Sequence, residues 1–425
     1  MATLSGSVVE SLSSEGQLRL VRFEIDGLFG GPNLVIGLPT PEDDDPNPQI
    51  MILSGANGAG KTTILKMIGG MLGLDFEICR QVPFNRASLT LSNGESLVVY
   101  KNLDLLEGFA RDDVRLRRAC LHISYGNYSS YLGNNGVENQ DFEPNVTRFR
   151  SRVLPILAGV KYDLLTVDRA ADPIEEERYY NPARRKERVE RPHLALRVKG
   201  FLSEAQVDYR KFFRATELDL LPRILKAIRS NADIPTQKAL VDRIEAVRRR
   251  AGDMRRYGLQ TDLLDIQALS DLLKDEKEAQ DLKVISTYVE MQESVNEERE
   301  LIARRVIAFE DIMDDFLTGK SIRVDANQGI IITTSMGVEI SEKQLSSGEY
   351  HFVYMMVSAL LCQRTGSVIA IDEPELSLHV SWQRKLVSAL AKCASGASPL
   401  FLLATHSIAI SAQHRSSVYE ISSID

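Results

Sequence analysis

The sequence has few cysteines and no long apolar run. Its cysteines, Cys79, Cys120, Cys362 and Cys393, lie far apart without C-x-x-C spacing, which argues against a zinc site and against a disulfide framework. No apolar stretch approaches the roughly 18 residues of a membrane-spanning helix. The Ser-rich start also lacks the basic-then-apolar pattern of a secretory signal. We therefore expect a soluble, cytoplasmic protein with free thiols and no membrane contact.

The chain also lacks an excess of positive charge. Its formal net charge is −8 at pH 7, so no global basic field attracts nucleic acid, and such a contact would need a local patch. The candidate patches are residues 184–191, Arg248–Arg250 and Arg255–Arg256. A solvated helix face is the favoured explanation of each, and a surface for DNA or for an acidic partner protein is the alternative.

A glycine-rich loop lies between an apolar strand and a helix. Residues 50–53 predict a buried strand, and the following Gly55-x-x-x-x-Gly60-Lys61-Thr62 is a Walker A phosphate loop. Glycines let the backbone adopt positive φ and approach an anion, while the backbone N–H groups and the helix N-terminus direct positive charge at phosphates. We expect Lys61 to reach the β- and γ-phosphates of ATP, and the Thr62 hydroxyl to ligate Mg²⁺. The candidate nucleotide-binding residues here are Gly55, Asn57, Gly58, Gly60, Lys61, Thr62 and Thr63.

The first part of the chain reads mostly as strands. Residues 18–38 alternate about a turn at Gly30-Gly31-Pro32, which predicts a hairpin. The helix after the phosphate loop is expected to end near Leu72. Further predictions are two or three strands within 76–100, a long loop over 126–145 and a buried strand over 160–167.

The middle of the chain has a different composition. Residues 173–200 are charged, and helical periodicity dominates from about 203 to 317. At about 1.5 Å per residue, even 55 continuous residues would span only ~80 Å, too short for the long coiled coil of chromosome-maintenance ATPases. We therefore predict a compact helical insertion. Strand patterns return over 321–340, and helices and strands then alternate as in a parallel sheet with crossover helices.

These patterns predict an α/β fold in which one ATPase domain is split by a mostly helical insertion. With 425 residues, 44% of them hydrophobic, the chain can form two or three domains. The expected division is 1–172 for the first half of the ATPase lobe, 173–316 for the insertion and 317–425 for the second half. The insertion is a candidate surface for a partner or for oligomerisation.

The second half contains an apolar strand that ends in carboxylates. Val368-Ile-Ala-Ile-Asp372-Glu373 has the pattern of a Walker B strand. Asp372 is expected to hold Mg²⁺ through water, and Glu373 to act as the catalytic base that orients and activates the attacking water. A buried strand followed by an acidic turn is the structural alternative.

Two further segments support the nucleotide-site interpretation. The candidate residues Ser346, Ser347, Gly348 and Glu349 follow Leu345, at a helix N-terminus that favours a phosphate. An ordinary Ser-capped helix is the alternative for this segment alone. Near the chain's end, the apolar strand 400–404 delivers Thr405-His406-Ser407 at its C-terminal end, where open α/β sheets bind ligands. His406 is the second candidate catalytic residue.

Together these motifs resemble the ABC-type ATPases of the SMC, RecF and OLD class. Leu345–Glu349 is similar to the ABC signature motif, and His406 resembles the switch histidine that senses the γ-phosphate. The segment Asp372-Glu-Pro-Glu-Leu-Ser-Leu-His379 is unlike that of transporters. It is similar to that of bacterial anti-phage ATPases: the OLD family, the PtuA protein of Septu and retron systems, and AriA of PARIS. The middle, about 173–316, resembles nothing recognisable.

The resemblance implies a head-to-tail dimer, or a higher homo-oligomer, with ATP sandwiched between copies. The signature of one chain would close on ATP held by another, and Glu375–His379 would lie along the seam. Family members also use a glutamine loop, for which Gln140 is one candidate. OLD-type nucleases carry a Toprim domain after the ATPase; the chain leaves no room for one after Ser407, and the middle shows no H-N-H or D-x-D pattern. No intrinsic nuclease is therefore expected.

Three functions remain open at this stage. The first is an ATP-dependent sensor and scaffold in bacterial anti-phage defence, which controls a separate effector such as a Toprim or HNH nuclease, with DNA or a phage protein as a further candidate partner. The second is a RecF-like DNA-repair ATPase. The third, an ABC transporter subunit, is disfavoured by the large insertion and by the segment after Asp372.

Overall fold

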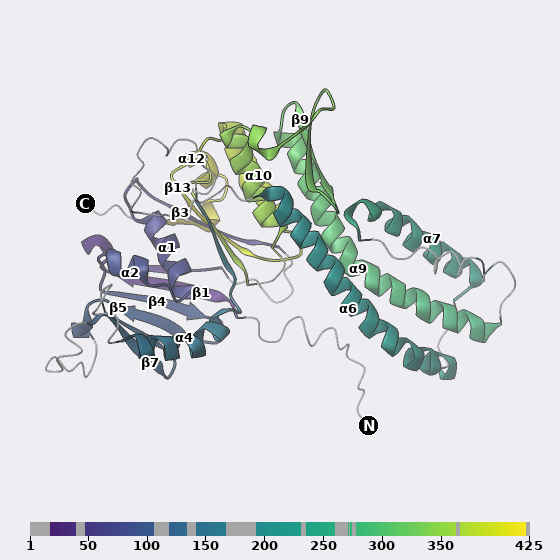
Figure 1. Ribbon diagram of the computed structural model, residues 1–425, viewed down its shortest axis with the longest axis horizontal. Coiled ribbons are helices and arrows are strands. Elements are labelled where there is room, and N and C mark those ends of the chain that lie inside the picture. The colour runs from purple at the N-terminus through teal and green to yellow at the C-terminus, as the bar shows by residue number, and fades with distance from the viewer. Residues whose placement is uncertain are drawn as a thin grey trace. The chain divides into compact units, whose positions relative to one another are not determined.

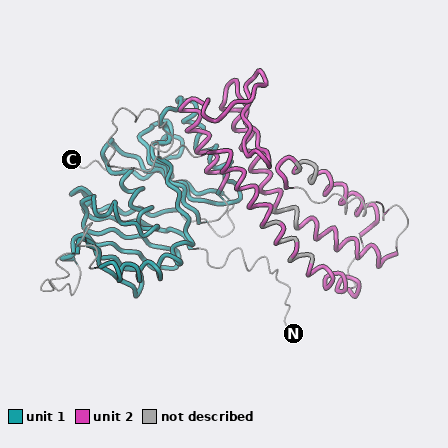
Figure 2. Tube along the Cα trace, in the orientation of Figure 1, with its two compact units in different colours: residues 1–171, 362–425 teal, residues 172–361 magenta. Residues whose placement is uncertain are grey.

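The computed structural model describes residues 18–39, 47–105, 119–133, 142–166, 193–230, 235–259, 271, 273, 278–362 and 366–421. It divides into two compact units, coloured separately in Figure 2: residues 1–171 with 362–425, and residues 172–361. We call them the first and the second unit. The three-part division expected from the sequence stays a prediction. The three strands after the insertion and the signature helix group here with the insertion.

The first unit contains a five-stranded parallel sheet. Its strand order is β14-β3-β13-β12-β8, and every neighbouring pair is parallel. Strands β12 and β13 are buried along their whole length, as expected for a sheet covered on both faces. This confirms the predicted α/β fold with a parallel sheet. The bounds are β3 Gln49–Ser54, β8 Tyr162–Leu165, β12 Val368–Asp372, β13 Leu400–Thr405 and β14 Val418–Glu420.

Helix α11, Val380–Cys393, connects β12 to β13, and α12, Ile408–Ser411, lies between β13 and β14; α1, Lys61–Leu72, follows β3 and leads toward the second sheet. The end of α1 at Leu72 matches the sequence prediction. Its apolar residues, among them Ile64, Leu65 and Ile68, are fully buried. They belong to one core that also takes in residues of the second sheet of this unit.

That second sheet has six antiparallel strands in the order β2-β1-β4-β5-β6-β7. Helix α4, Glu143–Leu157, packs against β7 (Figure 1). The short helix α2, Glu77–Gln81, and the 3-10 turns η2, Leu28–Gly30, and η3, Leu103–Leu105, lie in its connections. The strands are β1 Leu20–Asp26, β2 Leu34–Gly37, β4 Arg86–Leu91, β5 Ser96–Tyr100, β6 Ala119–Tyr125 and β7 Tyr128–Gly133.

One sequence prediction for this region needs correction. The expected hairpin over 18–38 is present as β1 and β2, but the expected loop over 126–145 is wrong, because 128–133 form β7 and 143–157 form α4. The strands expected within 76–100 are present as β4 and β5, and α2 precedes them. Polar residues conceal β7: Ser129 and Ser130 lie in a strand that pairs with β6 along its length, so tertiary pairing overrides weak local propensity.

The second unit is built on two long helices, α6, Leu194–Arg229, and α9, Ala279–Phe316. They pack side by side (Figure 1), and at about 1.5 Å per residue each is only ~55 Å long. Helix α7, Gln237–Asp253, packs on α9 and is followed by the 3-10 turn η6, Arg255–Tyr257. The predicted helical insertion is therefore present, without a long coiled coil among the described residues.

The rest of this unit is a small sheet and the signature helix. Strands β9, Lys320–Asp325, β10, Gly329–Thr334, and β11, Glu339–Ile340, form an antiparallel sheet where the sequence predicts strands. The 3-10 turn η7, Glu342–Gln344, leads into α10, Ser347–Leu360. A last 3-10 turn, η8, Arg415–Ser417, belongs to the first unit. Searched along its described length, the chain has no helix long and apolar enough to cross a membrane.

Candidate functional site

The phosphate loop connects β3 to α1 in the first unit. Gly58 and Gly60 have φ of 82° and 87°, a region that L side chains rarely adopt. A Cβ on Gly55 would lie 2.9 Å from the Ile421 carbonyl oxygen, so that position has no room for a side chain. Asn57 and Gly58 are exposed at the tip of the loop, and Thr63 is half-buried in the first turn of α1. The loop thus presents bare backbone next to a helix N-terminus, which suits an anion.

Lys61 is buried, and its ammonium group lies over the loop. Its Nζ donates to the carbonyl oxygens of Gly55, at 2.8 Å, and Ala56, at 2.9 Å. A buried ammonium needs acceptors, and these two carbonyls supply them at the place where the sequence predicts phosphates. Lys61 is therefore held within the loop rather than in solvent.

The structure brings Thr62 and Asp372 together although 310 residues separate them in the chain. The Thr62 Oγ1 donates to Asp372 Oδ1 at 2.9 Å. A hydroxyl and a carboxylate oxygen are ligands that suit Mg²⁺, which also takes water and substrate phosphates. No cluster of three or more His, Cys, Asp or Glu side chains that could hold a metal occurs in the described part of the chain, so a metal here would depend on the nucleotide for further ligands.

Asp372 is buried with its carboxyl group next to another acid. Burial raises the pKa of Asp372 above its ordinary value; the hydrogen bond from Thr62 lowers it, and Glu373 raises it again. The folded protein therefore binds a proton at Asp372 more tightly than the unfolded chain does. That contribution to stability is present at acidic pH and is lost as pH rises through the raised pKa, so at neutral pH the ionised group is a cost to folding.

We expect Asp372→Asn to stabilise the protein without nucleotide and to remove its response to Mg²⁺. The amide keeps an acceptor for Thr62 but carries no charge, so Tm at pH 7.5 should rise. The gain should vanish at acidic pH, where Asp372 is protonated. Differential scanning fluorimetry across pH, with and without MgATP, measures both effects. A variant that is less stable at pH 7.5, or that keeps the full MgATP shift, would contradict the assignment.

Glu373 lies on a strained turn directly after β12. Its φ is 49°, in the left-handed region that is uncommon for a residue with a side chain. Its backbone N–H donates to the carbonyl oxygen of Ala404 on β13, at 2.8 Å, which holds the turn in place. The side chain is half-buried, so it remains within reach of water. Strain of this kind is found where a side chain must be aimed.

His406 lies at the end of β13, between β3 and β12 in the sheet order. Its side chain is 46% exposed, and Nδ1 lies 3.1 Å from Oε1 of Glu375. Glu375 is buried and also accepts hydrogen bonds from the Thr405 hydroxyl, at 2.7 Å, and from the His406 backbone N–H, at 2.9 Å. The sequence places Glu375 only along an expected dimer seam; the link to His406 could not be read from the spacing of 31 residues.

The site also has an aromatic neighbour that the sequence does not indicate. Phe29 lies in η2 with φ 52° and is 42% exposed. A Cβ on Gly60 of the phosphate loop would lie 3.6 Å from Cε2 of Phe29. The ring is therefore next to the loop, where its exposed area offers a flat surface to a nucleotide base. An exposed aromatic in a glycine-flanked turn is the only signal that could have identified it.

The signature segment lies in the second unit, at the start of α10. Ser346 caps the helix: its hydroxyl accepts from the Glu349 N–H and Glu349 Oε2 accepts from the Ser346 N–H, a capping box. Ser346 and Ser347 are exposed, and Gly348 is half-buried. Burial opposes ionisation of Glu349, but hydrogen bonds from Lys320 and Ser346 outweigh it and lower its pKa. The segment is thus a rigid, exposed helix N-terminus.

The expected seam, Glu375–His379, forms a turn in which Leu376, Ser377 and His379 are exposed and Glu375 and Leu378 are buried. Ser377 has φ 61°, and the His379 ring accepts from the Ser381 N–H and so caps α11. Leu376 and Val380 are 39% and 47% exposed, and Ile408, at the start of α12, is 82% exposed. Helices α11 and α12 pack together. Apolar side chains exposed beside a candidate site are typical of a surface that another protein covers.

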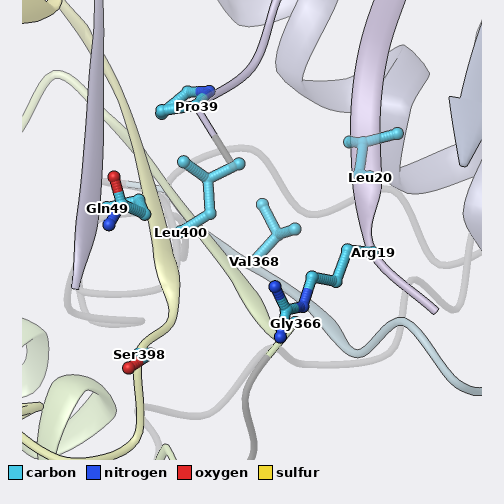
Figure 3. Close-up of a pocket in the computed structure, with 8 residues that line it drawn as sticks. All are labelled: Arg19, Leu20, Pro39, Gln49, Gly366, Val368, Ser398 and Leu400. Carbon is cyan, nitrogen blue, oxygen red and sulfur yellow. The ribbon is translucent and has the colours of Figure 1, made fainter. Parts of the chain in front are cut away.

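A small cavity of about 20 Å³ lies elsewhere in the first unit (Figure 3). It is lined by Gln49, Val368 and Leu400, at the starts of β3, β12 and β13, with Arg19 and Pro39 nearby. The phosphate loop, Asp372 and His406 all follow the other ends of these strands. The cavity holds about one water and is not the nucleotide site.

Gln140 and residues 184–191 lie outside the described residues.

Some candidate basic residues of the second unit are exposed, and one is engaged in an ion pair. Arg248 and Arg249 on α7 are exposed. Arg256 instead pairs with Glu310 of α9 and is therefore engaged in holding η6. Of these candidates, Arg248 and Arg249 remain as a described basic patch, and the side chains of Arg250 and Arg255 lie outside the described part of the chain.

A protein family and two solved structures resemble this chain. Residues 160–412 match the model of a family described as "AAA domain, putative AbiEii toxin, Type IV TA system". Among solved structures, an Smc head domain with an extended coiled coil, bound to the C-terminal domain of ScpA from Pyrococcus furiosus, is 16% identical. The match covers 93% of this chain and 91% of that chain with a TM-score of 0.39. An SmcHead bound to the C-winged helix domain of ScpA is 14% identical, with 93% and 92% covered and a TM-score of 0.36. No curated protein matches the sequence.

Proposed function

The chain belongs to this AAA-domain family, and we propose that it is a Mg²⁺-dependent ATPase whose complete site forms between two copies of the chain. The observation that carries the proposal is the 2.9 Å hydrogen bond between Thr62 and Asp372. It brings the phosphate loop and the end of β12 together as a hydroxyl and a carboxylate, which are fitting Mg²⁺ ligands.

In this proposal each part of the site has one task. The loop amides and Lys61 bind the triphosphate; Thr62 and Asp372 would hold Mg²⁺, which would supply positive charge to offset that of the phosphates. Glu373 accepts the proton of the attacking water. His406 contacts the γ-phosphate through the ring nitrogen that Glu375 leaves free. Phe29 packs against the base.

The signature segment completes the site from a second copy. The support is its exposed helix N-terminus, where Ser347 and Gly348 present hydroxyl and amide groups. The exposed apolar side chains of Leu376, Val380 and Ile408 provide an adjoining surface for that copy. A two-fold dimer of this kind has two equal sites, each using the loop of one chain and the signature of the other.

Mixing two inactive variants tests this arrangement. Lys61→Ala removes the cradle, and Ser347→Arg blocks the exposed signature without removing the Ser346 cap. Each variant alone should be inactive, because both of its sites carry a lesion. In a 1:1 mixture half of the dimers are mixed, and one of their two sites is intact, so activity should return to about a quarter of the parent value. Phosphate release measures it; no recovery from freshly mixed, exchangeable protein would exclude a shared site.

We propose further that the ATPase is a sensor and scaffold in bacterial anti-phage defence and controls a separate nuclease or toxin. The support is the family description, which names a toxin and a type IV TA system, and the Asp372–His379 sequence. Co-expression with the products of neighbouring genes, followed by phage challenge, tests this role. Protection should require those products and be lost in Lys61→Ala. Purified chain that degrades DNA or RNA with Mg²⁺ alone would refute the need for a separate effector.

A RecF-like role in DNA repair is the second candidate, and one observation favours it: Arg248 and Arg249 are exposed on α7. Two arginines can contact phosphates only weakly, with a strong salt dependence. DNA that raises the ATPase rate at low salt, with loss of this effect in a double Arg248→Ala and Arg249→Ala variant, would favour repair over defence.

A further inference from the structure

We propose that Glu375 is a positioning residue that fixes the tautomer of His406 and holds it against the turn that carries Glu373. This inference rests on the proposed ATPase function and adds to it a residue that binds neither nucleotide nor metal. It concerns the first unit only, where all the groups involved are described.

The Glu375 carboxylate is buried, with 6% of the residue exposed. The hydrogen bonds that it accepts come from Thr405, the last residue of β13, and from His406, which follows it. Oε2 accepts from the Thr405 hydroxyl at 2.7 Å. Oε1 accepts from the His406 backbone N–H at 2.9 Å and lies 3.1 Å from His406 Nδ1. Moving a carboxylate from water into the protein interior costs free energy unless hydrogen-bond donors replace its hydration. Here two hydrogen-bond donors on consecutive residues replace its hydration, and the His406 ring lies beside it.

The contact with Nδ1 decides the chemistry of the ring. A Glu375 oxygen 3.1 Å from Nδ1 would repel a lone pair on that nitrogen, so the contact favours the tautomer with hydrogen on Nδ1. Nδ1 is then committed to Glu375, and Nε2 is the ring nitrogen left for a phosphate oxygen or a water. A carboxylate or carbonyl that holds one ring nitrogen commonly sets which nitrogen of a histidine reacts.

The same residue also connects two strands. Glu375 belongs to the turn after β12, where Leu376 N–H donates to the Glu373 carbonyl at 3.0 Å and Leu378 N–H donates to the Glu375 carbonyl at 3.0 Å. On the β13 side, the Thr405 hydroxyl that donates to Glu375 accepts from the Ser407 N–H at 2.9 Å. Movement of the turn 376–379 would therefore be felt at His406 and at Glu373 together.

A second connection supports the same link. The Ser407 hydroxyl donates to Gln383 Oε1 at 2.7 Å, and Gln383 Nε2 donates to the Leu378 carbonyl at 3.0 Å. The turn after β12 and the segment after β13 are thus joined by Glu375 and again by Gln383. Glu375 alone reaches the imidazole ring.

Two variants separate positioning from simple structural support. Glu375→Gln keeps one acceptor oxygen for His406 and can turn its amide N–H group toward the Thr405 hydroxyl, which is able to accept. Glu375→Ala removes every acceptor. We expect kcat for ATP to fall about 10- to 100-fold in Glu375→Ala, the usual effect of losing a group that orients a reacting histidine, and much less in Glu375→Gln, with nucleotide affinity unchanged in both.

The decisive readout is the His406 tautomer, measured by ¹⁵N NMR on histidine-labelled protein. The chain has six histidines, and loss of one signal set in His406→Asn assigns the residue. The parent and Glu375→Gln should show a protonated Nδ1, and Glu375→Ala should shift toward the Nε2-protonated form. Glu24→Gln is the control: it removes another partly buried carboxylate of this unit, paired with Arg86 at 3.2 Å, and should leave the tautomer unchanged.

A double-mutant cycle completes the test. If Glu375 acts through His406, Glu375→Gln and Glu375→Ala should reduce kcat no further in a His406→Asn background. Equal reductions in both backgrounds, or an unchanged tautomer in Glu375→Ala, would overturn the proposal. If the parent chain does not hydrolyse ATP, the proposed function fails, and the NMR result still decides whether Glu375 sets the tautomer.

Discussion

Replacing Lys61 with alanine should abolish the ATPase reaction. The Lys61 ammonium is the one basic group held within the phosphate loop by loop carbonyls, at 2.8 and 2.9 Å, and a triphosphate would take over those bonds. Removing a buried, positioned donor of this kind costs about 100- to 1000-fold in rate, and the loss of a charge facing the phosphates should also weaken nucleotide binding.

Two measurements check this expectation. Steady-state phosphate release gives the rate, and the change in Tm on adding MgATP gives binding, since a ligand at 100 times its Kd stabilises by about 2.7 kcal/mol. The parent should show a clear shift and the variant none. Lys161→Ala is the matched control, because Lys161 is an exposed lysine of the same unit before β8. A Lys61→Ala protein with the parent's MgATP shift would show that the nucleotide binds elsewhere.

Replacing Glu373 with glutamine should stabilise the ATP-bound assembly of chains, whereas Lys61→Ala should weaken nucleotide binding. The amide keeps the shape of the side chain and the strained turn, in which the Glu373 N–H still donates to Ala404, but it cannot accept the proton of the attacking water. General-base catalysis contributes about 100- to 10,000-fold, so kcat should fall by that range while ATP binding is kept. ATP should then hold two chains together without release.

Light scattering after size-exclusion chromatography, with and without MgATP, checks the assembly. The variant should change from the mass of the 47.5 kDa chain to that of a dimer or larger assembly only when MgATP is present, and the addition of Lys61→Ala should abolish the change. Glu95→Gln, an exposed carboxylate after the β4–β5 turn, is the control. A Glu373→Gln protein that hydrolyses ATP at the parent rate would remove Glu373 from the mechanism.

The elements that carry these predictions were accessible from the sequence for a simple reason. A phosphate loop needs a strand, a glycine-rich turn and a helix in direct succession, so Ile50 to Leu72 contains the whole motif within one short segment. The same holds for the capped start of α10, where Ser346 and Glu349 bond to each other. The strand β7 was missed, because its polar residues gain their strand character only from pairing with β6.

The order of the motifs, the two classes of secondary structure and the residue types that suit phosphate and Mg²⁺ can all be read from the amino-acid sequence. Tertiary structure alone decided that Thr62 meets Asp372, that Glu375 is buried against His406, and that Arg256 is occupied by Glu310. The physical reason is that a motif made of neighbouring residues depends on local backbone geometry. A contact between distant residues depends on strand order in the sheet and on the direction in which packing turns each side chain.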